Sequence, residues 1–171
     1  IWDLKQVRME SSTEMALQTN SIRISRRMLL ARNAEGKFLS IKLPSLEAGG
    51  EFDAPFEYSG YDLSPDGSLV AFVPAKPNRI VLVDSNSGEE KASFTYSGEG
   101  TARFCGSSAY LAVAATGGKK VEILQISKAL GLTIKKTINS KAGTQITTIA
   151  SAPSGSMLGV GYSDGTVQVY S

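Results

Sequence analysis

Several side chains in this sequence could take part in catalysis, but the partners that such chemistry needs are missing. Serine is abundant, yet the chain contains no histidine, so it cannot assemble the Ser-His-Asp arrangement in which an imidazole activates the nucleophile. Histidine is also the commonest general base and metal ligand near neutral pH. A Ser-Lys pair remains conceivable, but the Ser-Gly and Ser-Asp pairs stand at turn positions. The sequence therefore predicts a protein that is not an enzyme.

Two glycine-rich segments and scattered aspartates are the other candidates for ligand binding. Residues 98–100 (Gly-Glu-Gly) and 116–119 (Thr-Gly-Gly-Lys) are too short for a phosphate-binding loop, and no helix is predicted after them. Asp62, Asp66 and Asp84 fall in different turns, whereas a calcium loop needs alternating oxygen ligands. We therefore expect hairpin turns at both segments, and neither a cofactor nor a metal.

The composition excludes several further classes of protein. The 171 residues are 42% hydrophobic and 20% charged, with a net charge of +2. This small net charge does not by itself indicate a nucleic acid or a membrane surface as partner. No apolar stretch approaches the roughly 20 residues that span a bilayer, and residues 1–4 do not open a signal peptide. The single cysteine, Cys105, excludes an internal disulfide. We expect a cytoplasmic or nuclear protein whose partners recognise local patches.

An internal repeat of about 40 residues organises the chain. Short β-branched runs have their middle residues at spacings of 40, 41, 41 and 46, namely Trp2, Lys42, Val83, Leu124 and Tyr170. A second series advances by 39, 41 and 46 residues: 21–25, 60–64, 101–105 and 147–151. Two series in step indicate one repeated unit.

Each unit predicts four short antiparallel strands. In the second unit we expect them at residues 61–64, 69–73, 79–84 and 91–96. Residues 64–67 (Ser-Pro-Asp-Gly) reverse the chain, because proline presets φ and glycine accepts a positive φ. Residues 163–165 (Ser-Asp-Gly) form a hairpin signal, so we expect turn conformations at Gly67 and Gly165. Four short strands in each unit of about 40 residues are typical of a propeller blade.

Three segments carry a resemblance to a known family. Residues 1–4 (Ile-Trp-Asp-Leu), 63–72 and 161–170 resemble the strand-ending Trp-Asp and the turn phrases of WD-repeat proteins. The family's Gly-His pair is missing and Trp-Asp occurs once. At the strand end of another unit, only the aspartate of this pair is present, as Asp84. The buried Asp-His-Ser-Trp network that the family often uses to rigidify a blade therefore cannot form. The resemblance implies a β-propeller of degenerate WD repeats.

The phase of the repeat predicts the blade boundaries. Each unit reads as an outer strand followed by three inner strands, and residues 1–4 read as the closing strand of a preceding unit. Because rings of this family usually have seven or eight blades, the resemblance implies half of such a ring: an all-β propeller segment with four repeats of four antiparallel strands. A self-contained small propeller and the pairing of two copies are the alternatives. The expected units are 14–43, 51–84, 91–126 and 134–171.

Strands that face neighbouring blades on both sides should be almost continuously apolar. Cys105 takes the place that Ser25, Ser64 and Ser151 hold in the other units, so we expect a small buried side chain rather than a reactive thiol. The predicted core residues are Leu69, Ala71, Val81, Val83, Leu111, Val113, Ile123, Leu158, Val160 and Val167.

Propellers usually bind partners on loops at one rim. Three of the four loops between the second and third inner strands are basic, and equivalent positions on adjacent blades bring their charges to one face. We expect an acidic or phosphorylated protein segment as partner; a nucleic acid is possible but not favoured, because aromatic residues do not alternate with the charges. The candidate binding residues are Arg32, Asn33, Lys37, Lys76, Asn78, Arg79, Lys119, Lys120 and Tyr162, and Asp164 shares the last loop.

The pattern as a whole favours a non-enzymatic scaffold that presents a propeller rim to proteins in a larger assembly. The alternative is a propeller domain accessory to a peptidase or to a periplasmic transport system, because the Ser-Pro-Asp-Gly turn followed by Val-Ala-Phe resembles those domains too. The remaining blades of the same propeller, or a second copy, are the other expected partners.

Overall fold

All regular structure in the described part of the chain is β-strand. The computed structural model describes residues 2–3, 8–9, 17–76, 78–96, 100–106, 108–115, 117–152 and 155–171, of which 2–3, 8–9, 17–21 and 78 are described by their backbone alone. The strands form antiparallel sheets, which confirms the all-β prediction. No helix in these ranges is long and apolar enough to cross a membrane.

Four sheets follow one another along the chain, and the strands of each pair in sequence order. The first sheet consists of β3 (Leu17–Ile24), β4 (Met28–Asn33), β5 (Phe38–Lys42) and β6 (Ala48–Phe52). The second consists of β7 (Tyr58–Leu63), β8 (Leu69–Pro74), β9 (Asn78–Asp84) and β10 (Glu90–Tyr96). The third consists of β11 (Gly100–Cys105), β12 (Tyr110–Ala115), β13 (Lys120–Ile126) and β14 (Leu132–Asn139). The fourth has three strands, β15 (Ile146–Ser151), β16 (Leu158–Tyr162) and β17 (Val167–Tyr170).

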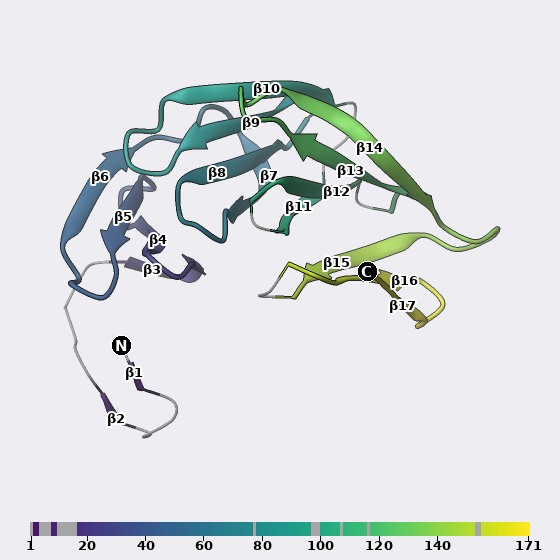
Figure 1. The fold of residues 1–171 in the computed structure, drawn as a ribbon, viewed down its shortest axis with the longest axis horizontal. Coiled ribbons are helices and arrows are strands. Elements are labelled where there is room, and N and C mark those ends of the chain that lie inside the picture. The colour runs from purple at the N-terminus through teal and green to yellow at the C-terminus, as the bar shows by residue number, and fades with distance from the viewer. Residues whose placement is uncertain are drawn as a thin grey trace.

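The four sheets stand side by side around an arc (Figure 1). The first strand of each sheet lies on the inside of the arc, where β7 contacts β3 and β11, and β11 contacts β15. The outer strands β6, β10 and β14 lie on the periphery (Figure 1). Sheets arranged radially with their first strands at the centre are the architecture of a β-propeller.

The sequence repeat and the sheets are out of step by one strand. The outer strands at the start of the later units belong to the preceding sheets, where β6, β10 and β14 pair with β5, β9 and β13. The first unit differs from the expectation. Residues 17–24 form one innermost strand, β3, with irregular pairing to β4 between Gln18 and Arg23. The outer strand expected at the start of unit 14–43 is therefore not a separate strand there, and residues 14–16 lie outside the described residues.

Of the closing strand expected at residues 1–4, residues 1 and 4 lie outside the described residues. Within that segment, β1 (Trp2–Asp3) pairs with β2 (Arg8–Met9). These two strands form a sheet of their own, apart from the four sheets of the arc (Figure 1). The assignment of residues 1–4 to a preceding unit stays a prediction.

Apolar side chains fill the spaces between adjacent sheets. The strand β8 is buried along its whole length, because it is the second of four strands in a sheet with a neighbouring sheet on each side. Of the predicted core residues, Ile123 is half-buried and Val167 is 68% exposed. The prediction for Val167 is wrong because β17 is the outermost strand of the fourth sheet in the described chain. The other eight are buried, namely Leu69, Ala71, Val81, Val83, Leu111, Val113, Leu158 and Val160.

The two turns singled out in the sequence have the expected backbone. Gly67 has φ of 80° and Gly165 has φ of 83°, a region in which a Cβ atom is disfavoured. The N–H of Gly67 donates to the carbonyl of Ser64 at 2.8 Å, and that of Gly165 to the carbonyl of Tyr162 at 3.0 Å. Both turn predictions are confirmed.

Candidate functional site

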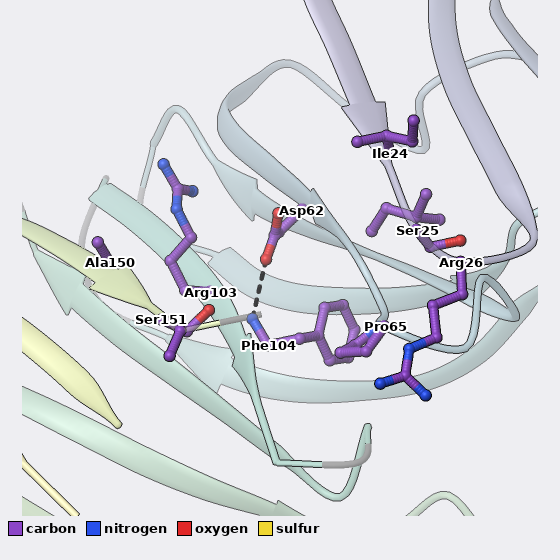
Figure 2. A pocket seen from close by; sticks show the side chains of 11 residues that line it. Ile24, Ser25, Arg26, Asp62, Pro65, Arg103, Phe104, Ala150 and Ser151 are labelled. Carbon is purple, nitrogen blue, oxygen red and sulfur yellow. Dashed lines mark hydrogen bonds between the residues drawn. The ribbon is translucent and has the colours of Figure 1, made fainter. Parts of the chain in front are cut away.

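The inner strands of all four sheets meet around a cavity of about 610 Å³. The charged side chains in its wall are Arg26, Asp62 and Arg103, and Figure 2 shows how these groups lie. The remaining lining residues are Ile24, Ser25, Leu63, Pro65, Phe104, Ala150, Ser151 and Ala152.

The carboxylate of Asp62 joins three sheets at this cavity. Its Oδ2 accepts a hydrogen bond of 2.9 Å from the backbone N–H of Phe104 in β11 (Figure 2). Its Oδ1 lies 3.6 Å from Nε of Arg23 in β3. Arg23 also stacks over the ring of Tyr61, 4.8 Å from its centroid. One side chain of β7 thus contacts the innermost strands of the sheets before and after its own.

Burial sets the protonation behaviour of Asp62. Removal from water raises the pKa of this carboxyl above its ordinary value, and the Phe104 N–H and the charges of Arg103 and Arg23 partly offset that rise. Arg103 is itself held in place, because its Nη1 donates to the carbonyl of Ala102 at 2.7 Å and to Oγ1 of Thr101 at 3.1 Å. These contacts suit a structural junction between sheets.

The one thiol next to this region is poorly suited to nucleophilic chemistry. Cys105 is buried, as expected, and burial raises the pKa of its thiol. Its Sγ donates to the carbonyl of Arg103 at 3.5 Å. Because the thiolate is the nucleophile, a raised pKa lowers its reactivity near neutral pH.

Further polar contacts connect neighbouring sheets. The N–H of Gly100 in β11 donates to Oγ of Ser59 in β7 at 2.9 Å. The N–H of Gly50 in β6 donates to Oδ1 of Asn86, in the turn after β9, at 2.7 Å. The N–H of Gly106 donates to the carbonyl of Gly155 at 2.9 Å, which connects the third and fourth sheets. Backbone and short side chains therefore hold each neighbouring pair of sheets.

The sequence-predicted rim lies at the β4–β5, β8–β9 and β12–β13 loops. These loops join the second and third strands of three adjacent sheets with the same strand order, so they open at the same end of the sheets. We call the side chains of Arg32, Lys37, Lys76, Arg79, Lys119 and Lys120 the basic rim.

Most cations of the basic rim pair with a glutamate of their own sheet or of a loop beside it. Lys37 lies 3.5 Å from Glu51, and Lys76 lies 3.5 Å from Glu57. Arg79 pairs with Glu90, and Lys120 lies 2.6 Å from Glu122. Glu51 and Glu90 could not be predicted from the sequence, because they reach Lys37 and Arg79 across strand pairs. The rim therefore carries glutamates beside most of its cations.

Arg32 and Asn33 have contacts that shape the rim loop. Nε of Arg32 donates to the carbonyl of Gly36 at 2.7 Å, and its guanidinium lies over the ring of Tyr58. Oδ1 of Asn33 accepts hydrogen bonds of 3.0 Å from the N–H groups of Glu35 and Lys37. Asn33 therefore stabilises the turn.

The other two candidates differ from the basic rim. Tyr162 is buried at 5% exposure, and its hydroxyl bonds to Oε1 of Gln168 at 3.0 Å. This burial corrects the expectation that its side chain contacts a partner, since the ring packs in the core between the third and fourth sheets. Asn78 begins β9, and its side chain lies outside the described residues. Asp164, in the β16–β17 turn, accepts the Thr166 N–H at 3.0 Å.

The residues that sequence analysis overlooked are Arg23 and Asp62 as a pair, with Arg103 beside them. A signal was present, because they are the middle residues of the first three members of the 21–25, 60–64 and 101–105 series. Equivalent positions on inner strands meet at the centre of a ring, so opposite charges there indicate a contact between blades.

Together these sheets and contacts define a β-propeller. The chain is similar to the β-propeller domain of Cps50 (Swd1) from Myceliophteria thermophila, with a TM-score of 0.64 and 13% identity over 95% of this chain and 54% of that one. It is similar also to hydrazine synthase of Kuenenia stuttgartiensis, with a TM-score of 0.57 and 13% identity over 95% and 51% of the two chains. The chain spans about half the length of these structures. No family model and no curated protein sequence matches it.

Proposed function

We propose that this protein is a degenerate WD-repeat propeller that acts as a non-enzymatic scaffold and presents the basic rim to an acidic or phosphorylated protein segment. The likeness to solved propellers supports the fold alone, because one fold hosts many functions. The functional proposal rests on the site. A location in the cytoplasm or nucleus is part of the same proposal.

The observation that carries the proposal is the difference between the charged groups of the inner strands and those of the basic rim. Asp62 and Arg23 serve as a junction between sheets, whereas Lys76, Lys119 and Lys120 of the rim loops are exposed. Lys76, for example, has a side chain that is 85% exposed. A scaffold needs a rigid centre and accessible loops, and this arrangement supports both.

The glutamates beside the rim do not block an acidic ligand. Ion pairs between exposed side chains typically contribute less than about 1 kcal/mol, because water screens them and both side chains lose freedom. A ligand carboxylate or phosphate can therefore exchange with Glu57 or Glu51 at little cost. Phosphate would gain further from bidentate contact with Arg79.

Charge reversal tests this proposal. The double variant K76E/R79E should weaken binding of a fluorescein-labelled oligoglutamate probe by about tenfold, because rim charges control encounter and orientation. Its thermal midpoint should stay nearly unchanged, since neither side chain belongs to the core. Binding should also weaken as salt rises, because charges are screened over about 8–10 Å at physiological ionic strength.

The matched control is K42E/K128E, which makes the same change in net charge at exposed lysines away from the rim loops. Fluorescence anisotropy at low and moderate salt would report the affinities. Equal affinity for wild type and K76E/R79E would overturn the basic-rim proposal.

A further inference from the structure

A second surface, distinct from the basic rim, lies between the third and fourth sheets. It is a groove of about 320 Å³, within the range of small ligand sites. Its wall is mainly apolar and comes from both sheets. The apolar lining side chains are Tyr110, Ile123, Ile138, Met157, Leu158 and Tyr170.

Two consecutive lysines, Lys135 and Lys136, line this groove. Neighbouring residues of a regular strand point to opposite faces, so the strand must be irregular here. The pairing of β13 with β14 shifts at this point: Ile123 pairs with Lys136 and Leu124 with Ile134, which leaves Lys135 as the extra residue. Such a bulge redirects side chains, which explains how two consecutive residues line one groove.

These lysines differ from those of the basic rim in their partners. Neither forms an ion pair with a described residue, and the described lining of the groove contains no carboxylate side chain. Both side chains are exposed. The groove therefore combines apolar surface with two lysines that pair with no carboxylate side chain of its described lining.

One lining side chain is unusually exposed for its size. Met157 is 49% exposed and sits on the wall that the fourth sheet supplies. Flexible methionine side chains adapt to different apolar ligands. Its exposure leaves apolar surface that a ligand would remove from water.

We propose that this groove binds an extended segment of a partner protein in which apolar and acidic residues alternate. An apolar side chain would enter the space between the two sheets, and the neighbouring carboxylates would reach Lys135 and Lys136. The apolar wall favours a peptide over a nucleic-acid backbone, which would present only phosphate and sugar to Met157 and Tyr170. The inference rests on the proposed scaffold function and adds a second binding surface to it.

The test uses a fluorescein-labelled peptide of about ten residues in which leucine and glutamate alternate. Two control peptides replace every leucine by serine or every glutamate by glutamine. The wild-type protein should bind the alternating peptide about tenfold more tightly than either control, because each control lacks one component of the recognition. Equal binding of the serine control would overturn the proposal, since it would indicate attraction by charge alone.

Variants locate the site. K135E/K136E should weaken binding of the alternating peptide by about tenfold, and M157S by about threefold through lost apolar contact. All three positions are exposed, so the thermal midpoints should match that of wild type. K42E/K128E, with the same charge change elsewhere, should bind within about twofold of wild type.

The rim variant K76E/R79E separates the two proposals. It should bind the alternating peptide like wild type if the groove is a separate site. Loss of peptide binding in K76E/R79E with full binding in K135E/K136E would overturn the groove and leave the rim standing. With the oligoglutamate probe, full binding by K76E/R79E and loss of binding in K135E/K136E would overturn the rim proposal and leave the groove proposal.

Discussion

Asp62 illustrates how a single residue can connect several blades. Its carboxylate accepts the N–H of Phe104 on one side and pairs with Arg23 on the other. Its carboxylate is only 14% exposed. Removal of a buried acceptor is most costly when its hydrogen-bond donors stay behind without a partner.

Truncation of Asp62 should therefore be more harmful than a neutral replacement. Asp62→Ala leaves the Phe104 N–H without its partner and should lower the free energy of unfolding by about 1–3 kcal/mol. Asp62→Asn keeps an acceptor and should cost less than about 1 kcal/mol, because Arg23 is partly exposed. Urea unfolding of both variants would measure this, and equal losses would show that the acceptor is not the important feature.

The raised pKa of Asp62 also has a pH signature. Because the folded carboxyl binds its proton more tightly than the unfolded one, folding is favoured at low pH, and this contribution is lost as pH rises from about 3.8 through the folded pKa. Asp62→Asn removes the titration. As pH rises across that window, the free energy of unfolding of wild type should therefore fall relative to that of Asp62→Asn. A difference that does not change with pH would contradict the burial of the carboxyl group.

Asp66 should show the opposite sign. Burial raises the pKa of its carboxyl, but hydrogen bonds from Ser64 and Ser68 outweigh burial and hold the pKa below its ordinary value. A lowered pKa stabilises the fold above about pH 3.8, and this stabilisation is lost as pH falls through the folded pKa. The acid limb of the stability profile should be shallower in Asp66→Asn, as measured by chemical denaturation between about pH 5 and pH 3. If Asp66→Asn lost stability with falling pH as steeply as wild type, Asp66 would not contribute to the acid sensitivity of the fold.

At the scale of elements, two turns with the same backbone should differ in their tolerance. A Cβ at Gly67 would lie 2.8 Å from Cβ of Met28 and 2.8 Å from Oγ of Ser25, whereas one at Gly165 would meet nothing within 4 Å. Gly165→Ala should cost about 1–2 kcal/mol from backbone strain alone. Gly67→Ala should cost about 1–3 kcal/mol more, because the first sheet must move. Thermal unfolding would compare them, and equal costs would mean that the contact relaxes freely.

Strands and turns were predictable because their signals are local. The pattern of residues 61–96 predicted β7 to β10 to within three residues at each end, since short apolar runs and Pro-Asp-Gly chemistry act within a few positions. The glutamate partners of the basic rim were not predictable. Glu51 and Glu90 reach Lys37 and Arg79 across strand pairs whose register depends on bulges, such as the irregularity between Glu90 and Ala92.

At the scale of the whole molecule, the repeat predicted the order of the sheets, and the likeness to solved propellers bears out the fold. What the repeat could not predict was the environment of each face. Val167 follows the core pattern of its unit, yet it is exposed because β17 has no further strand beside it in the described chain. The groove beside Lys135 likewise depends on a bulge that no periodicity reveals.

The proposed scaffold function places the contacts with acidic partners on the basic rim and leaves the inner strands as a rigid frame. Hydrogen–deuterium exchange, measured by mass spectrometry with and without saturating oligoglutamate probe, tests this claim most directly. We expect slower exchange in peptides covering at least two of the three rim loops, at residues 34–37, 75–79 and 117–120, with no change in β7 or β11. Protection confined to the inner strands around Asp62 and Arg103, or no protection in any rim loop, would contradict it.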